Sequence, residues 1–231
     1  MEAPLQFRDR TQGGEFLAQR LLQSRLQQPV TVLALPRGGL PTGLAVARSL
    51  QAPLDIVTVR KIGLPANPEF AVGAVAAGVV FQDEQAAAGS GLSADAFAAL
   101  VRQAQRELQR REVHYRQHLS ALDLTGQTAV VVDDGLATGA TMLAAVQAVR
   151  ARGARRIIVA APVASQEAAA RLRPAADDLV FGKLPATLRS VGEWYQEFDQ
   201  VTDQETLFLL EAAAQQARPE PPQSVLFRSA P

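Results

Sequence analysis

Two adjacent carboxylates, Asp133 and Asp134, are the residues of this sequence whose type and spacing best suit chemistry. They follow a short apolar β-branched run, Ala129 to Val132, which is typical of a buried central strand. The next residues are small or hydroxylated and leave backbone N–H groups approachable, and a helical pattern begins at Met142. Such a turn at a helix N-terminus binds anions. Carboxylates beside an anion cradle suit a ligand with hydroxyl groups on one side and a phosphate on the other, such as a ribose 5-phosphate.

The run A-V-V-V-D-D-G-L-A-T-G-A-T resembles the phosphoribosyl pyrophosphate binding signature of the type I phosphoribosyltransferases, a hydrophobic strand followed by two acids and a T-G-x-T loop. The resemblance implies that Asp133 and Asp134 are catalytic residues that hold the ribose 2′ and 3′ hydroxyl groups. It also implies that the loop wraps the 5′-phosphate. The loop residues are Ala137, Thr138, Gly139, Ala140 and Thr141. The alternative is a generic strand–turn–helix with an acidic cap, which would rarely place paired acids and T-G-x-T in this order.

A second turn with anion-binding character, P-R-G-G, follows the expected strand from Val30 to Leu35. Its two consecutive glycines let backbone amides approach an anion closely, and Arg37 adds a fork of donors suited to phosphate oxygens. In the resembled family this turn binds pyrophosphate, which implies that role for Arg37, Gly38 and Gly39. The alternative is an ordinary strand–helix turn with a surface arginine.

The stretch from Arg60 to Glu69 contains one glycine and two prolines, which predicts a loop long enough to act as a lid. In the resembled family a mobile loop that follows an R-K pair closes over the active site. The resemblance therefore implies that Arg60 binds pyrophosphate and that Lys61 acts in catalysis facing the leaving group. The alternative is a solvated basic end of a strand.

The acceptor base is not identified by the resemblance. Family members that act on 6-oxopurines carry Asp immediately before T-G-x-T, where this chain has Ala137. Alanine there is more similar to adenine-type members, whose proton donor is a lid carboxylate, and this implies Glu69 as that catalytic group. In the resembled family a small hood of terminal segments sandwiches the base, which implies a C-terminal hood over residues 182–215 here, with stacking by Trp194 and Tyr195. The alternative is that these rings only pin the C-terminal segment to the core.

The elements that must position these residues alternate strand and helix, which predicts an α/β fold: a parallel twisted sheet with helices on both faces and the site at the C-terminal ends of the strands. The expected strands are 30–35, 54–59, 129–132, 155–162 and 178–181. The expected helices are 13–28, 40–50, 142–152, 166–173 and 202–215. A hairpin is expected from 71–76 and 79–82.

We expect one domain over residues 1–215, with a core at about 30–181 and a flexible tail at 216–231. A helical insertion at about 85–120 starts as a small-residue linker and continues as a long helix capped by Ser93. Its arginines alternate with Gln and Glu and lack aromatic neighbours, which favours a solvated or subunit-packing face, as in a homodimer, over nucleic acid. His114 and His118 are four residues apart, but no Glu follows His114 as the zinc-hydrolase pattern requires, so we expect no protein metal site.

Composition excludes several classes of protein. The 231 residues carry 23 basic and 23 acidic side chains, so net charge gives no reason to expect a polyanionic partner. The absence of cysteine excludes thiol catalysis and disulfides and fits a reducing compartment. The N-terminal residues lack an apolar signal region, and the longest apolar run, Phe70 to Phe81, is too short to span a bilayer. We therefore expect a cytoplasmic protein without membrane contact.

The resemblance implies an enzyme of nucleotide metabolism, in purine or pyrimidine salvage, that transfers the 5-phosphoribosyl group from phosphoribosyl pyrophosphate to a nitrogenous base and releases pyrophosphate. It also implies Mg²⁺ bound mainly through substrate oxygens. One alternative is a non-catalytic regulator of the same fold that senses phosphoribosyl pyrophosphate or a nucleotide. Another is a phosphatase or nucleotidase that uses the acid pair, for which we find no metal ligands in the sequence.

Overall fold

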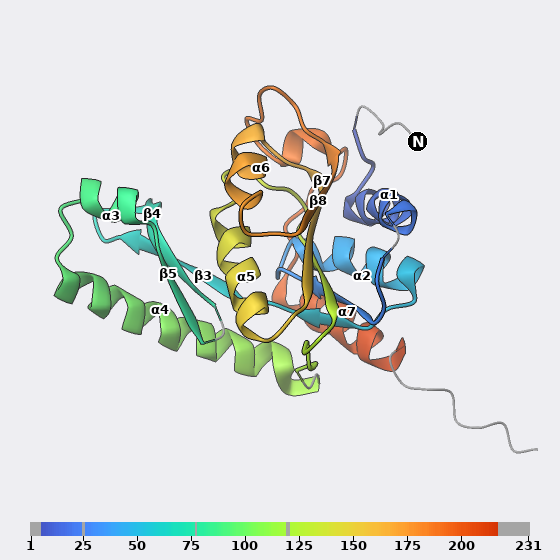
Figure 1. Ribbon diagram of the computed structural model, residues 1–231, viewed down its shortest axis with the longest axis horizontal. Helices are drawn as coiled ribbons and strands as arrows, with labels where there is room; N and C mark the ends of the chain where they lie inside the picture. Colours follow the sequence, from blue (N-terminus) through green and yellow to red (C-terminus); the bar gives the residue numbers. More distant parts are fainter. Residues whose placement is uncertain (1–5, 25, 77, 119–120, 217–231) are drawn as a thin grey trace, which may run out of the picture.

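The computed structural model describes residues 6–24, 26–76, 78–118 and 121–216 (Figure 1). A five-stranded sheet forms its centre. The strands are β1 (Val30–Ala34), β2 (Leu54–Ile56), β6 (Thr128–Val132), β7 (Arg156–Val163) and β8 (Asp178–Lys183). Their order is β2-β1-β6-β7-β8 and every pairing between neighbours is parallel.

Helices cover both faces of this sheet (Figure 1). On one face lie α1 (Arg10–Gln23), α2 (Gly39–Leu50) and α7 (Asp203–Gln216), and on the other lie α5 (Ala140–Ala151) and α6 (Gln166–Leu172). Alternate residues of a strand point to opposite faces, so Val130 and Val132 pack under α1 and α2 while Val131 packs under α5. A sheet covered on both faces needs apolar side chains at every position, which explains the uninterrupted apolar runs. The predicted fold class is confirmed.

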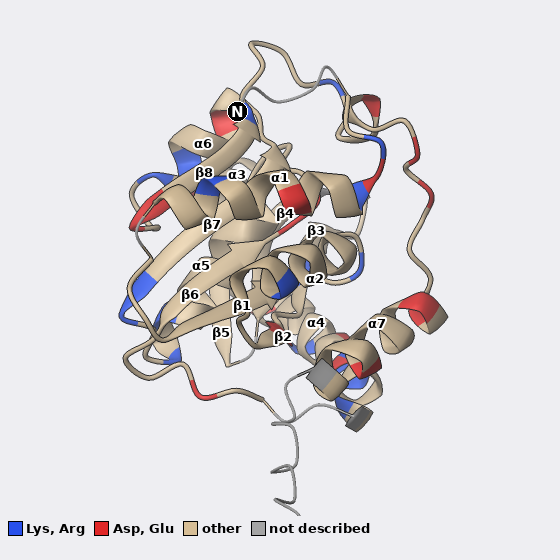
Figure 2. Cartoon of the chain, turned by 90° about the vertical axis from the view of Figure 1, so that its right-hand side faces the viewer, with Lys and Arg blue, Asp and Glu red and all other residues tan. Residues whose placement is uncertain are grey.

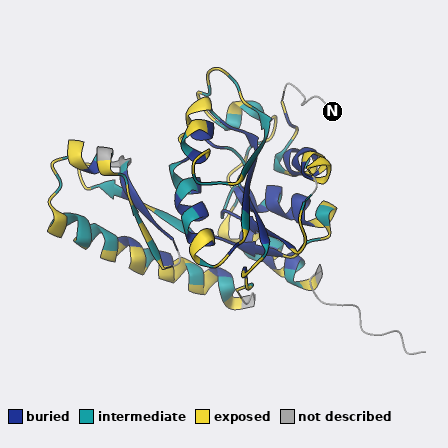
Figure 3. Cartoon of the chain, in the orientation of Figure 1, coloured by how far each residue is buried: buried dark blue, intermediate teal, exposed yellow. Residues whose placement is uncertain are grey.

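The buried and charged residues separate as this layering requires. Figure 3 shows the central strands in the buried colour. Figure 2 shows the middle of the sheet without charged residues, with Lys, Arg, Asp and Glu on helices, loops and strand ends around it. In the described part of the chain, no helix combines the length and the apolar character needed to cross a bilayer.

A second, smaller sheet extends to one side of the central one (Figure 1). Its strands β3 (Val59–Leu64), β4 (Asn67–Ala76) and β5 (Val79–Gln82) are antiparallel. The expected hairpin of 71–76 with 79–82 is confirmed. The lid loop expected from Arg60 to Glu69 is wrong, because these residues form the tight β3–β4 hairpin. Gly63 lies at a shift of the strand register, and Ile62 is buried against the helical insertion, so packing makes a strand of a sequence that reads as a loop.

The helical insertion packs on this small sheet. It consists of α3 (Glu84–Gly89), α4 (Ala94–Tyr115) and a short 3-10 turn η1 (Arg116–His118). The Ser93 cap is confirmed, since its hydroxyl accepts a hydrogen bond from the Ala96 N–H at 3.2 Å. The linker expected at 85–92 is wrong: α3 forms there because Asp83 caps it and Ala87 is buried between the sheet and α4.

The first helix begins earlier than the sequence pattern suggests. Asp9 caps it by accepting a hydrogen bond from the Gln12 N–H at 2.8 Å, so Gly13 and Gly14 lie inside the helix. Their missing side chains permit close packing, since a Cβ at Gly14 would overlap the Thr42 carbonyl of α2. The C-terminal segment carries a 3-10 turn η2 (Gly192–Trp194) and ends in α7. The expected tail beyond residue 216 lies outside the described residues.

Candidate functional site

The acid pair and the P-R-G-G turn meet at one edge of the central sheet. β1 and β6 are parallel neighbours with Ala34 opposite Val132, so the residues that follow each strand emerge side by side. A Cβ at Gly38 would overlap the Asp134 carboxylate, and a Cβ at Gly39 would lie 2.9 Å from an Asp133 carboxylate oxygen. The two glycines therefore allow the turn to lie directly against the acid pair. The peptide bond before Arg37 is cis.

Asp133 and Asp134 keep some solvent-exposed surface, but protein groups surround both carboxylates. Burial, together with the adjacent Asp134 carboxylate, raises the pKa of Asp133 well above its usual value. The Asp134 N–H donates to Asp133 Oδ1 at 2.9 Å. Burial also raises the pKa of Asp134, but the Arg10 guanidinium opposes this rise by donating from Nε to Asp134 Oδ2 at 2.7 Å.

Arg10 is a site residue that sequence reasoning missed. Besides Asp134, it donates to the Asp199 carbonyl at 2.7 Å, and its guanidinium carbon lies 3.8 Å from the centre of the Phe198 ring. These contacts fix one cation between the first helix, the acid pair and the C-terminal segment. The only local hint in the sequence is a basic residue directly after the helix cap Asp9, where the helix dipole disfavours positive charge.

The predicted phosphate loop joins β6 to the start of α5. Gly139 has φ 72° at the N-cap of α5, a left-handed conformation that favours glycine, and Ala137 and Thr138 are exposed. The neighbouring strand end holds this loop: Leu136 N–H donates to the Val163 carbonyl at 3.0 Å, and the Ser165 hydroxyl donates to the Ala137 carbonyl. The first turn of α5 begins six residues after Asp134, and its N–H groups lack helical partners, although that of Ala140 lies 3.5 Å from the Thr138 hydroxyl. Such a helix start suits an anion.

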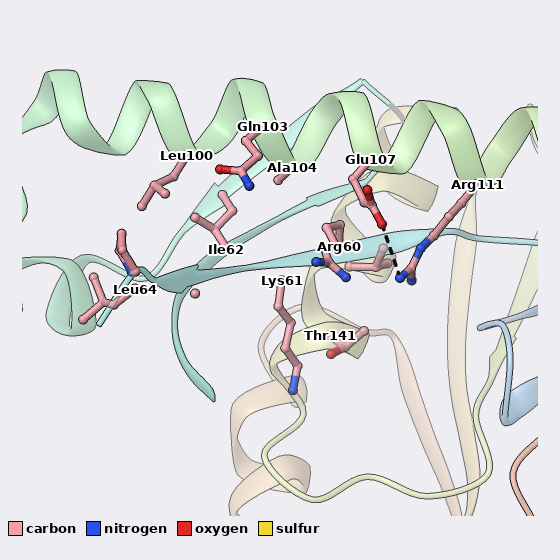
Figure 4. Close-up of a pocket in the computed structure, with 13 residues that line it drawn as sticks. Arg60, Lys61, Ile62, Leu64, Leu100, Gln103, Ala104, Glu107, Arg111 and Thr141 are labelled. Carbon is pink, nitrogen blue, oxygen red and sulfur yellow. Dashed lines mark ion pairs between the residues drawn. The ribbon is translucent and has the colours of Figure 1, made fainter. Parts of the chain in front are cut away.

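Arg60 and Lys61 lie on β3 rather than on a loop. Both line a cavity of about 610 Å³ between β3, α4 and the start of α5, where Thr141 is also a lining residue. Figure 4 shows Lys61 pointing towards the segment that carries Thr141 and Arg60 lying nearer to α4. Asp133 and Asp134 do not line this cavity. Glu69 belongs to β4, and its side chain lies outside the described part of the structure.

Arg37 does not point towards the acid pair. Its guanidinium lies 3.5 Å from Asp203 of α7, which also accepts a hydrogen bond from the Tyr115 hydroxyl at 2.7 Å. Burial and this hydrogen bond raise the pKa of Tyr115 to about 12. Arg37 lines a second cavity, of about 500 Å³, between the P-R-G-G turn, α4 and α7. The structure therefore brings Gly38 and Gly39 to the acid pair but directs the Arg37 side chain to Asp203 of α7 instead.

The two predicted base-binding rings have different surroundings. Tyr195 is buried and stacks on Phe198 at 5.0 Å between ring centres, and its hydroxyl donates to the Asp134 carbonyl at 2.5 Å. For Tyr195, these contacts favour the alternative interpretation, in which the aromatic rings attach the C-terminal segment to the core. Trp194 Nε1 is buried without a hydrogen-bond partner among the described residues, and the Lys183 ammonium lies 5.5 Å from the ring centre. Base binding by either ring stays a prediction.

Replacing Arg10 with Gln tests its hold on Asp134. Asp133, Tyr195 and Arg10 are the titratable groups that face Asp134, and Arg10 is the cation among them that favours its ionised form. Without Arg10 the pKa of Asp134 rises, so any activity that needs its carboxylate falls by about tenfold or more at neutral pH. The acid limb of kcat/KM against pH moves to higher pH, and Arg10→Lys restores part of the loss. The control is Arg8→Gln, an exposed neighbour, and an unchanged pH profile for Arg10→Gln would contradict the role.

The comparisons with known proteins agree with this geometry. The family model described as phosphoribosyl transferase domain matches residues 6–185. A Mycobacterium tuberculosis (strain ATCC 25618 / H37Rv) protein named "Putative phosphoribosyl transferase Rv0571c" is 44% identical over 208 residues, which are 90% of this chain and 47% of that protein. The crystal structure of TT1426 from Thermus thermophilus superposes with a TM-score of 0.78 at 39% identity, covering 90% of this chain and 98% of that one.

This chain spans about half the length of the mycobacterial relatives it matches. The family match nevertheless runs from the residues before α1 to the end of β8 and includes the P-R-G-G turn, the acid pair and the loop before α5. The chain therefore belongs to the phosphoribosyl transferase domain family.

Proposed function

We propose that this domain transfers the 5-phosphoribosyl group from phosphoribosyl pyrophosphate to a ring nitrogen of a base and releases pyrophosphate. The observation that carries the proposal is the packing of Gly38 and Gly39 against the acid pair, next to the open N-terminus of α5. Carboxylates accept hydrogen bonds from ribose hydroxyl groups, and backbone N–H groups at a helix N-terminus bind a phosphate. Both ends of a ribose 5-phosphate thus have matching groups within one sheet edge.

In this reaction the bond from C1 of the ribose to pyrophosphate oxygen breaks, the bond from C1 to the base nitrogen forms, and the nitrogen loses its proton. C1 is electron-poor while this happens. Asp133 and Asp134 hold the hydroxyl groups and their negative charge stabilises the positive charge that develops on the sugar. Arg60 and Lys61 face the cavity at Thr141, and their cationic groups there stabilise the charge of the departing pyrophosphate. Glu69 is proposed as the group that handles the proton of the base.

The donor set suits a Mg²⁺ ion held mainly by substrate. The described residues contain no group of three His, Asp or Glu side chains arranged to hold a metal, and Arg10 already occupies one oxygen of Asp134. Mg²⁺ prefers several water and phosphate oxygens and few protein ligands. Bound to the donor, it would neutralise charge on the pyrophosphate. We place the reaction in nucleotide salvage in the cytoplasm, and the absence of cysteine is compatible with that compartment.

The test is release of pyrophosphate from phosphoribosyl pyrophosphate and Mg²⁺ in the presence of a panel of purine and pyrimidine bases. We expect release that depends on one class of base and stops when Mg²⁺ is chelated. Binding of the donor without release for any base would contradict catalysis and favour the sensing regulator. No binding of the donor at all would contradict both functions.

A further inference from the structure

Two cavities described above share one wall, which is α4. The cavity of about 610 Å³ lies between α4 and β3, and the cavity of about 500 Å³ lies between α4, the P-R-G-G turn and α7. Arg111 lines both of them. The first contains Thr141 of the phosphate loop and the second contains Arg37. Arg111 therefore stands between two segments that the proposed donor would touch.

The lining of both cavities has more positive than negative charge. Arg60 and Lys61 join Arg111 in the first cavity, where Glu107 is the acidic lining residue. Glu107 is shared, since its Oε1 lies 3.4 Å from Arg110 and 3.7 Å from Arg111. One carboxylate at these distances leaves both guanidinium groups with unused donors.

The second cavity repeats this imbalance. Arg37, Arg110, Arg111 and His114 line it against one carboxylate, Asp203. Asp203 is itself shared by Arg37 and the Tyr115 hydroxyl. A surplus of guanidinium forks facing enclosed space suits a ligand with several phosphate oxygens.

Arg111 has the best position for such a ligand among the arginines of α4. The Arg110 side chain is 76% exposed, whereas the Arg111 side chain is 43% exposed. In Figure 4 the Arg111 side chain extends from α4 towards β3, on the same side of the helix as Glu107, and faces the space beside Arg60. The ion pair with Glu107, at 3.7 Å, favours this orientation.

We propose that Arg111 binds the pyrophosphate arm of the donor, so that α4 is the outer wall of the substrate site rather than a solvated or subunit-packing helix. This inference rests on the proposed function for the identity of the donor. It gives the helical insertion a specific role in binding, because the planar guanidinium lies between the cavity that Arg60 and Lys61 line and the cavity that Arg37 lines, where it donates charge-assisted hydrogen bonds to the pyrophosphate oxygens. Ribose 5-phosphate lacks the pyrophosphate, and the proposed site of its 5′-phosphate is the N–H groups at the start of α5, so it makes no contact with Arg111 in this proposal.

Calorimetric titration separates this binding role from a structural one. Wild type, Arg111→Gln, Arg111→Lys and the control Arg106→Gln are each titrated with Mg²⁺–phosphoribosyl pyrophosphate, with Mg²⁺–pyrophosphate and with ribose 5-phosphate. Arg106 is exposed on the same helix and lines neither cavity. We expect Arg111→Gln to weaken both pyrophosphate-containing ligands by about 10- to 100-fold and to leave ribose 5-phosphate affinity unchanged. Arg111→Lys should be intermediate, because a single ammonium cannot bridge two phosphates in the same way.

Two results would overturn the role of Arg111 while leaving the proposed function intact. One is equal donor affinity for Arg111→Gln and Arg106→Gln. The other is an equal loss of ribose 5-phosphate affinity in Arg111→Gln, which would indicate a general disturbance of the site. If wild type binds none of the three ligands, the proposed function fails and the inference fails with it.

Discussion

Asparagine in place of either Asp133 or Asp134 is expected to lower the rate of pyrophosphate release by about 10²- to 10³-fold, because a neutral amide cannot stabilise the positive charge that develops on the ribose. The amide keeps the size of the side chain. It also keeps an oxygen at the position where Asp133 accepts the Asp134 N–H. The measurement is the steady-state release of pyrophosphate with the best base. Asp95→Asn, an exposed carboxylate in the first turn of α4, is the control, and wild-type rates in both site variants would contradict the assignment.

The stability of Asp133→Asn makes this experiment interpretable. The pKa of Asp133 is raised in the folded state, so as pH rises above the usual value of 3.8 the unfolded chain ionises first and the folded state loses stability. At neutral pH the carboxylate therefore costs folding free energy, and asparagine removes that cost. We expect Asp133→Asn to unfold at or above the wild-type temperature at pH 8, with a smaller advantage at pH 4. A large drop in its unfolding temperature at pH 8 would contradict the burial argument.

Alanine in place of Asp55 is expected to destabilise the fold by about 3 kcal/mol or more, the cost of breaking a buried ion pair on one side. The Asp55 side chain is 1% exposed and accepts from Arg116 at 2.9 Å and from the Leu122 N–H at 3.1 Å. Arg152 lies 3.4 Å from its second oxygen. Removing the carboxylate leaves two arginines, each 22% exposed, without their shared counter-charge.

Urea unfolding measures this loss, and the matched comparison is Glu167→Ala. Glu167 pairs with Arg171 at 3.3 Å on the surface of α6, with its side chain 63% exposed. Solvent screening limits such a pair to less than about 1 kcal/mol. An Asp55→Ala variant no less stable than Glu167→Ala would show that the Asp55 network contributes little. The network matters for the site because it fixes the end of α4 to β2 and α5.

The succession of strand, acid pair, small-residue loop and helix was predictable because it is local. A buried β-branched strand, two acids, small residues and a helix follow one another without a gap, and the structure arranges them in that order from β6 to α5. The alternation of strand and helix also sufficed for the class of fold, since parallel strands require crossover helices. The position of P-R-G-G beside the acid pair was not predicted, because it depends on β1 and β6 being neighbours in the sheet, which the structure shows.

The β3–β4 hairpin and α3 were not predictable from local signals. Gly63 and Pro65 favour a loop when taken alone, and the alanines of α3 read as a linker. Burial of Ile62 and Ala87 against α4 outweighs these preferences. Local propensities amount to fractions of a kcal/mol per residue, whereas burying one large apolar side chain contributes about 1.5–3 kcal/mol, so long-range packing prevails.

The sequence by itself determined the α/β class, the carboxylate pair with the small-residue loop that follows it, and the glycines that let a neighbouring segment approach closely, because each depends on residues next to one another in the chain. Only the tertiary structure decided that Arg10 holds Asp134, that Arg37 turns to Asp203, and that Arg111 lines the cavity that Thr141 also lines. Arg10 and Asp134 are 124 residues apart, and no pattern of spacing encodes such a contact. The positions of these cations follow from how the helices pack on the sheet, which is a property of the whole chain.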